Sequence, residues 1–172
     1  MAADDTYEHR TMFFFQSGED DPHGWGLEFE RFARCLGEGF PQANSVLQEA
    51  GSTRARLGIW AETDDGVEFS GMVSLGAQDT VLIEDNSAEE AARFVMWLRQ
   101  EVVPAGRPIM VGSEAAIDAG LEAGDCRIPD DADAAGVADT LRRHLAQARA
   151  AEIAQACDDA AQEAEDRQSG SS

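Results

Sequence analysis

Residues 54 to 85 read RARLGIWAETDDGVEFSGMVSLGAQDTVLIED, and this stretch decides the fold. Apolar and polar residues alternate in three successive parts of it. The apolar positions of this pattern are Leu57, Ile59, Ala61, Val67, Phe69, Val73, Leu75, Val81 and Ile83. A period of two is typical of a strand with one buried face. The stretch therefore predicts an antiparallel meander of three strands.

The register of the first hairpin follows from the same alternation. Both strands must present their apolar residues to one face, which requires pairs such as Ile59 opposite Gly71. A two-residue turn would instead place Glu62 beside Phe69. The pattern thus predicts a three-residue loop, Asp64-Asp65-Gly66, in which glycine adopts the left-handed conformation.

Two kinds of element are expected before the meander. The apolar run TMFFFQ at 11–16 predicts a central strand that is covered on both faces. Residues 27–36 repeat apolar side chains at helical spacing, so we expect a helix that ends at Gly37 or Gly39. Residues 43–51, ANSVLQEAG, are interpreted as a second short helical stretch that ends at its glycine.

Helical patterns dominate the part of the chain after the meander. Ser87 stands three residues before Glu90, a capping box, and opens a helix over 87–104. PIMV at 108–111 predicts a strand, and a short helix is expected after Ser113. From Asp133 an Ala-rich stripe predicts a long helix.

The fold class that these elements predict is α+β. We expect a mixed, mostly antiparallel sheet of about five strands, with helices packed on it and a long C-terminal helix. A polar arm at 1–9 precedes a single domain over 10–150, and 151–172 form an acidic, Ala-rich helical tail with a frayed end.

The charge of the chain is strongly negative. Asp and Glu number 34 against 13 basic residues, for a net charge of −21, and every basic residue is Arg. A GC-rich genome, a high-salt environment and a basic protein partner each explain such a surface. The charge argues against nucleic-acid binding, because phosphate backbones are repelled. The lack of Lys excludes Schiff-base lysines and Walker-type phosphate sites.

The sequence also bears on compartment and cofactors. Three cysteines cannot all pair within one chain and form no CxxC motif, which favours a reducing compartment. No apolar run reaches the roughly 18 residues of a membrane span, and the N-terminus lacks the pattern of a signal peptide. We therefore expect a cytoplasmic protein without a membrane segment, a metal or a cofactor.

Two short motifs are candidates for chemistry. Asp20, Asp21 and His23 could form an acid/base or metal pocket in the 20–25 loop, although a turn that packs Trp25 on the core fits the same residues. Ser113 precedes a helix start, where it could help to bind an anion or act as a simple N-cap.

The face of the meander opposite its buried side mixes large apolar side chains with charged ones and offers a surface for binding. Its residues are Arg56, Trp60, Glu62, Glu68, Met72 and Leu82. Either the C-terminal helix covers this face, or Trp60 and Met72 anchor a partner inside an acidic rim. On the second interpretation the partner-binding residues are Trp60, Glu62, Asp64, Asp65, Glu68 and Met72.

Two functions remain open from the sequence. The first is a non-catalytic module, such as an inhibitor, immunity-type protein or adaptor, that recognises a basic protein. The alternative is a small enzyme that uses the Asp/His pocket of the 20–25 loop.

Overall fold

The fold is a single antiparallel sheet with helices on one side of it. The computed structural model describes residues 9–21, 24–49, 55–76, 78–122 and 126–170. Within these ranges seven strands form one sheet in the order β2-β3-β4-β5-β1-β6-β7. Every neighbouring pair of strands is antiparallel. The α+β class is confirmed, but among the described residues the sheet is antiparallel throughout instead of mixed, and it is larger than the expected five strands.

The bounds of the elements are as follows. The strands are β1 (Thr11–Gln16), β2 (Asn44–Gln48), β3 (Arg56–Glu62), β4 (Glu68–Ser74), β5 (Thr80–Asn86), β6 (Met110–Ser113) and β7 (Cys126–Arg127). The helices are α1 (Phe29–Gly39), α2 (Ala88–Trp97), α3 (Glu114–Asp118) and α4 (Ala134–Ser169), and a π-helical segment (Leu98–Val102) continues α2.

The meander forms with the predicted register. Ile59 lies opposite Gly71 in the β3–β4 pair. The backbone N–H of Gly66 donates to the carbonyl of Thr63 at 3.0 Å, and Gly66 has a φ of 87°. Thr63 and Val67 close the hairpin with a further backbone bond of 2.9 Å. The three-residue loop Asp64-Asp65-Gly66 is therefore confirmed.

The segment expected to be a second helix is a strand. Asn44–Gln48 form β2, which pairs with β3 from Asn44 opposite Trp60 to Gln48 opposite Arg56. Good helix formers in this segment favoured the helical interpretation, but pairing with the open edge of β3 outweighs local propensity. Gly51, its expected end, lies outside the described residues. The two-residue strand β7 pairs with β6 and completes the sheet.

One hydrophobic core fills the space between the sheet and the helices. The sheet supplies Phe13, Phe15, Leu57, Ile59, Phe69, Val73, Val81, Ile83 and Val111, and the helices supply Phe32, Leu36, Phe94, Leu98, Val137 and Leu141. The rings of Phe69 and Phe94 have centroids 5.1 Å apart, which ties β4 to α2. The alternating residues of the meander thus face the helix layer, as their period requires.

Two predicted caps position the helices. At the start of α2, Ser87 accepts from the N–H of Glu90 while the Glu90 carboxylate accepts from the N–H of Ser87. This is the expected capping box. Ser113 caps α3 by accepting from the N–H of Ala116 at 3.1 Å. The sequence allowed either an anion site or a simple N-cap at Ser113, and the structure contains the N-cap.

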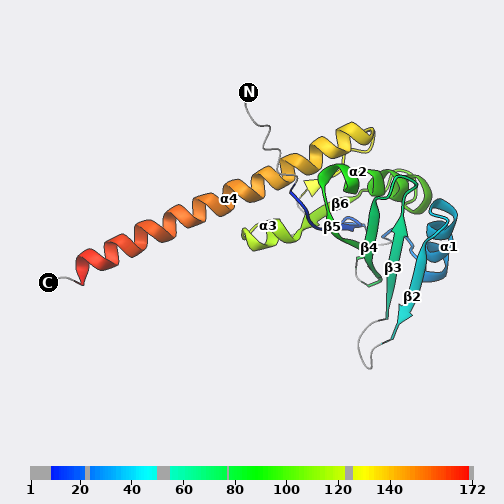
Figure 1. Cartoon of the computed structure of the whole chain (residues 1–172), viewed down its shortest axis with the longest axis horizontal. Helices are drawn as coiled ribbons and strands as arrows, with labels where there is room; N and C mark the ends of the chain where they lie inside the picture. The colour runs from blue at the N-terminus through cyan, green and yellow to red at the C-terminus, as the bar shows by residue number, and fades with distance from the viewer. Residues whose placement is uncertain (1–8, 22–23, 50–54, 77, 123–125, 171–172) are drawn as a thin grey trace.

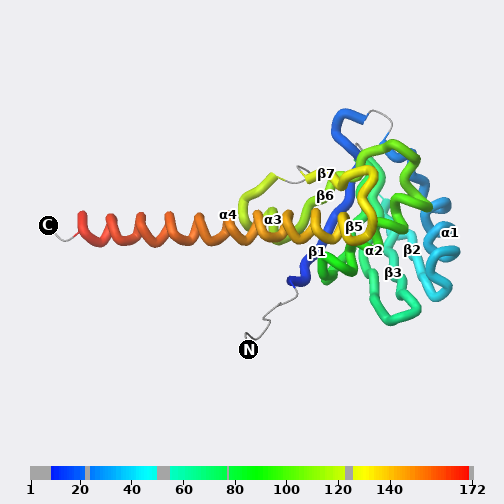
Figure 2. Tube along the Cα trace, turned by 90° about the horizontal axis from the view of Figure 1, so that it is seen from above, coloured from blue at the N-terminus to red at the C-terminus, as the bar shows by residue number. Residues whose placement is uncertain are grey.

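The helix α4 docks by its first half only. Its buried residues run from Val137 to Ala148 and contact α2 and α3. Residues 152–170 are exposed, and Figures 1 and 2 show this part of the helix extending well beyond the rest of the molecule. No helix within the described ranges has the length and apolar character needed to cross a membrane.

Candidate functional site

The face of the sheet that points away from the helices carries a row of apolar residues, which is interrupted at Gly58, where the amide of Gln48 lies over the glycine. We call this face the outer face. Strand pairing places Val46 opposite Gly58, Gly58 opposite Met72, Met72 opposite Leu82, Leu82 opposite Phe14 and Phe14 opposite Gly112. Residues directly opposite one another share a face. The row therefore crosses the sheet from β2 to β6.

The row is open to solvent over the meander. Val46 is 56% exposed, and Met72 and Leu82 are partly exposed. At the other end the ring of Phe14 packs over Gly112, where a Cβ atom would collide with it. Phe14 is thereby buried although it lies on the outer face, which fits the expectation that β1 is covered on both faces. The buried part of α4 belongs to the helix layer, so α4 does not cover the meander.

Carboxylates flank the row on one side. Trp60 lies opposite Ser70, which lies opposite Glu84, and Glu62 lies opposite Glu68 at the end of the hairpin. All of these residues share the outer face with Met72, because their numbers have the same parity in the register. Four of the six predicted partner-binding residues, Trp60, Glu62, Glu68 and Met72, thus lie together.

A single arginine of the meander approaches the row from its other side. The guanidinium of Arg56 lies 3.9 Å from the sulfur of Met72. Because three carboxylates and one guanidinium then surround Trp60 and Met72, this part of the outer face has a negative balance. It suits an apolar contact that is surrounded by positive charge.

The remaining two predicted residues lie in the hairpin loop, and one of them is already paired. Asp65 accepts two hydrogen bonds of 2.8 Å from Arg93 of α2, so its carboxylate points toward the helix layer. These bonds hold the pKa of Asp65 well below its ordinary value. Asp64 is exposed at the tip of the loop. Asp64 can therefore extend the acidic rim, whereas Asp65 is occupied.

The 20–25 loop has a structural role in its described part. Asp21 pairs with Arg107 at 2.6 Å. Trp25 is buried and donates from its indole N–H to the carbonyl of Pro108 at 3.0 Å. The side chain of Asp79 accepts from the backbone N–H groups of Trp25 and Leu27. The expected turn that packs Trp25 on the core is present.

Within the described residues, the structure contains no arrangement of side chains that supports the acid/base interpretation of the same loop. Asp20 is exposed, and His23 lies outside the described residues. Among the residues that are described, no three His, Cys, Asp or Glu side chains are placed to share a metal ion.

The structure brings together three residues that the sequence kept apart. The Nε2 atom of His144 lies 2.8 Å from the Oγ atom of Ser113, and both side chains are buried. His144 and Cys126 line a cavity of about 370 Å³ beside Arg127 and Gln147. The sequence signal for this contact was weak: His144 falls on the buried stripe of α4, one turn after Leu141.

The environment of this cluster opposes nucleophilic chemistry. Burial lowers the pKa of His144 and raises the pKa of the Cys126 thiol. A neutral imidazole and a protonated thiol are the stable forms there, and the thiolate is the reactive form of cysteine. Ser113 is fully buried and serves as the cap of α3. The contact between Ser113 and His144 therefore docks α4 on β6.

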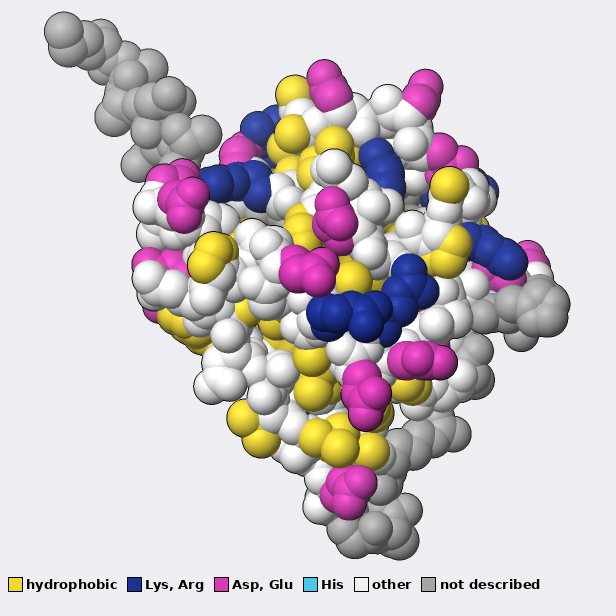
Figure 3. Space-filling view, turned by 90° about the vertical axis from the view of Figure 1, so that its right-hand side faces the viewer, with side chains coloured by type: hydrophobic (Ala, Val, Ile, Leu, Met, Phe, Trp, Pro, Cys, Tyr) yellow, Lys and Arg dark blue, Asp and Glu magenta, His cyan; other side chains and the backbone are white. Residues whose placement is uncertain are grey.

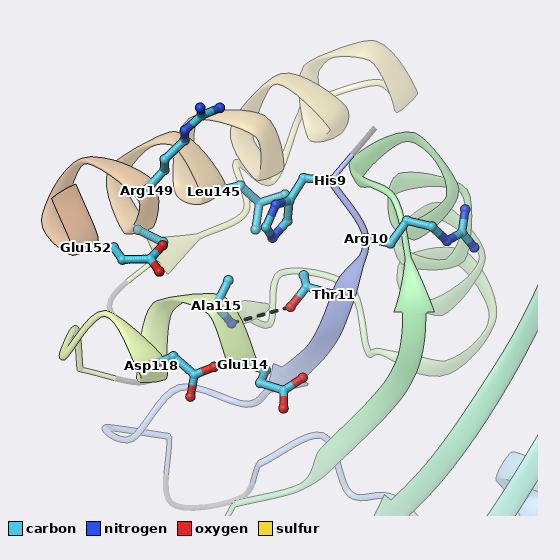
Figure 4. Close-up of a pocket in the computed structure, with 10 residues that line it drawn as sticks. His9, Arg10, Thr11, Glu114, Ala115, Asp118, Leu145, Arg149 and Glu152 are labelled. Carbon is cyan, nitrogen blue, oxygen red and sulfur yellow. Dashed lines mark hydrogen bonds between the residues drawn. The ribbon is translucent and has the colours of Figure 1, made fainter. Parts of the chain in front are cut away.

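A second cavity lies where α3, α4 and the start of β1 meet, as Figure 4 shows. Its volume is about 500 Å³, and its lining includes Glu114, Asp118, Glu152 and Arg149. The Oγ atom of Thr11 accepts from the N–H of Ala115 at 3.4 Å at its base. The lining of the cavity also includes His9 and Arg10, so acidic and basic side chains face the cavity together, and these residues come from distant parts of the sequence.

Comparison with known proteins does not assign a family. No family model, curated protein or solved structure matches the chain.

Proposed function

We propose that the chain is a non-catalytic binding module that recognises a basic protein through the outer face of its sheet. An inhibitor, an immunity-type protein and an adaptor would all work in this way. The observation that carries the proposal is the apolar row through Met72 and Leu82, open to solvent beside carboxylates. A sheet of an isolated domain can face water on one side, but that side is then mostly polar.

The anchor of the contact is the pair of large side chains at the centre of the meander. Trp60 and Met72 are diagonal neighbours on adjacent strands, since Trp60 lies opposite Ser70. Aromatic residues and Met are enriched in the centres of protein interfaces, where desolvation makes them contribute most. Both side chains are partly exposed and available for burial.

The partner is expected to be basic for two reasons: carboxylates lie close to the anchors, and the whole chain has a negative long-range field. Glu62, Glu68 and Glu84 lie next to the anchors on the outer face. The net charge of −21 adds a long-range field that speeds the approach of a positive protein and repels a negative one. The short-range rim selects the orientation, and the field raises the encounter rate.

The experiment is a capture of partners with three forms of the chain. Wild type, Trp60→Ala/Met72→Ala and Ile153→Ala serve as baits in cells that naturally contain the protein. Ile153 is 55% exposed on the free part of α4, so its variant controls for the loss of an exposed apolar side chain. Wild type and Ile153→Ala should retain one basic protein that the double variant loses. Unchanged circular dichroism shows that each bait is folded.

A site-specific cross-link separates a contact on this face from capture elsewhere. A photoreactive residue at Ser70, exposed beside Trp60, should label the captured protein. The same residue at Gln100, exposed in the helix layer, should not. Labelling from Gln100 alone, or equal capture by all baits, would contradict the proposal.

A further inference from the structure

The edge strand β2 is exposed over most of its length, and its sequence lacks the residues that usually blunt the edges of natural sheets. It begins the strand order, and in the described part of the chain only β3 pairs with it. An edge strand leaves alternate backbone N–H and C=O groups without a partner in the sheet. Natural edges are blunted by charged side chains, proline, bulges or short length.

None of these devices occurs within β2. Its sequence, NSVLQ, has no charge and no proline, and its pairing with β3 is continuous over five residues. Val46 is 56% exposed on the outer face and Leu47 is 50% exposed on the opposite one. Figure 3 shows hydrophobic side chains at the surface on this side of the molecule.

The opposite edge of the sheet makes the contrast clear. β7 contains only Cys126 and Arg127, and Arg127 is ion-paired with Asp130 at 3.0 Å. That edge is short and charged. In a chain in which 27% of residues are charged, the neutral edge is the exception.

We propose that an extended segment of the basic partner pairs with β2 as a further strand of the sheet. This inference rests on the proposed function and specifies how the partner binds. Val46 lies on the outer face of β2, so an added strand would extend that face of the sheet. Addition of a strand to a sheet edge is a common mode of peptide recognition, in which backbone bonds supply affinity and alternate side chains supply specificity.

Charge distinguishes a basic partner from a second copy of the chain. Two copies joined at β2 would each bring a net charge of −21, and their repulsion opposes the pairing. A basic segment meets no such cost. Its outward side chains would lie beside Asn44, Val46 and Gln48, where the negative field of the chain favours basic residues. Its other side chains would lie beside Leu47. The favoured segment therefore alternates basic and apolar residues.

The test uses a blocked peptide of five Arg-Val repeats as the probe. Binding is measured by calorimetry, and amide exchange is measured by NMR. The peptide should bind and slow the exchange of alternate amides within Asn44–Gln48. The same peptide N-methylated at every residue keeps its charge but loses the backbone donors of both edges, and it should not bind. A peptide of Glu-Val repeats should not bind either.

A pair of variants with the same change of charge provides the control. Val46→Arg places a positive charge on the edge and should weaken binding of the Arg-Val peptide by about tenfold or more, as for a like charge in an interface. Ile153→Arg makes the same change on the free part of α4 and should leave binding unchanged. Equal binding of the N-methylated peptide, or equal weakening by both variants, would overturn the proposal.

Two further outcomes separate this inference from its alternatives. If the chain alone sediments as a dimer that Val46→Arg dissociates, the edge pairs with a second copy and the proposal is wrong. If the captured partner is cross-linked from Ser70 but leaves the β2 amides unprotected, the edge proposal fails while the outer-face proposal stands.

Discussion

Arg93 on α2 holds Asp65 at the tip of the β3–β4 hairpin through two N–H···O bonds of 2.8 Å. The hydroxyl of Thr63 donates a third bond of 2.7 Å to the same carboxylate. The pair ties the end of the hairpin to the helix layer. It also explains why Asp65 does not join Trp60 on the outer face, although both were predicted to bind a partner.

The first prediction concerns the titration of this pair. The pKa of Asp65 is lowered from 3.8 chiefly by the hydrogen bonds from Arg93. Its contribution to folding is therefore present above the unfolded pKa and is lost as the pH falls through the folded one. Arg93→Ala should raise the NMR titration midpoint of the Asp65 carboxyl toward its ordinary value. Arg127→Ala, which breaks a different surface pair, should leave it unchanged.

The second prediction tests the hairpin loop. Gly66 has a φ of 87°, and a Cβ atom added there would meet nothing within 4 Å. Gly66→Val should therefore destabilise the fold by about 1–2 kcal/mol through backbone strain alone. Gly37, in α1, has equally open space without the unusual φ, and Gly37→Ala should stabilise by roughly 0.5–1 kcal/mol. Urea unfolding measures both, and equal effects would count against the strained loop.

The register of the meander was predictable because it depends only on parity. A period of two requires an odd number of loop residues if Ile59 and Phe69 are to share a face, and the shortest common loop of this kind needs the glycine that the sequence supplies. The caps at Ser87 and Ser113 were predictable because each bond spans only three residues. Local chemistry of this kind needs no knowledge of the tertiary structure.

The features that the sequence left open all depend on distant contacts. β2 exists through its pairing with β3, which local propensity does not report. Whether the outer face is open depends on where α4 docks, and the contact of Ser113 with His144 joins residues 31 positions apart. The sequence therefore identified candidate binding residues from their side-chain types. It did not predict how exposed they are, or that Asp65 is paired with Arg93.

The third prediction concerns the core between α2 and the sheet. Leu98 is fully buried in the cluster that includes Phe94. Leu98→Ala should cost roughly 2–5 kcal/mol of stability, because it removes buried methyl groups and leaves a cavity. Ile153→Ala, at an exposed site, should change stability by less than about 0.5 kcal/mol. A loss below about 1 kcal/mol for Leu98→Ala would be incompatible with its burial.

The fourth prediction is a pH dependence that arises from His144. Burial lowers its folded pKa below the ordinary value of 6.5. Below pH 6.5 the unfolded chain therefore takes up a proton that the folded chain does not, and stability falls until the folded pKa is passed. His144→Gln should remove this part of the pH dependence. His9→Gln, which removes an exposed histidine, should leave it in place; an unchanged profile for His144→Gln would refute the assignment.

The last prediction concerns the kinetics of partner binding, measured once capture has identified a basic protein. If the acidic field steers the encounter, the association rate should fall steeply as salt rises, because the screening length is about 10 Å at 0.1 M salt. Dissociation depends instead on short-range contacts, so Trp60→Ala should speed release with little change in association.

Two pairs of charge variants show which carboxylates speed the association with the partner. Glu62→Gln/Glu68→Gln removes two carboxylates next to Trp60 and should slow association with little effect on release. Glu163→Gln/Glu165→Gln makes the same change of charge on the exposed part of α4 and should slow association less, since screening weakens distant charges. An association rate that is flat across salt, or equal slowing by the two pairs, would mean that the carboxylates of the outer face do not guide the partner.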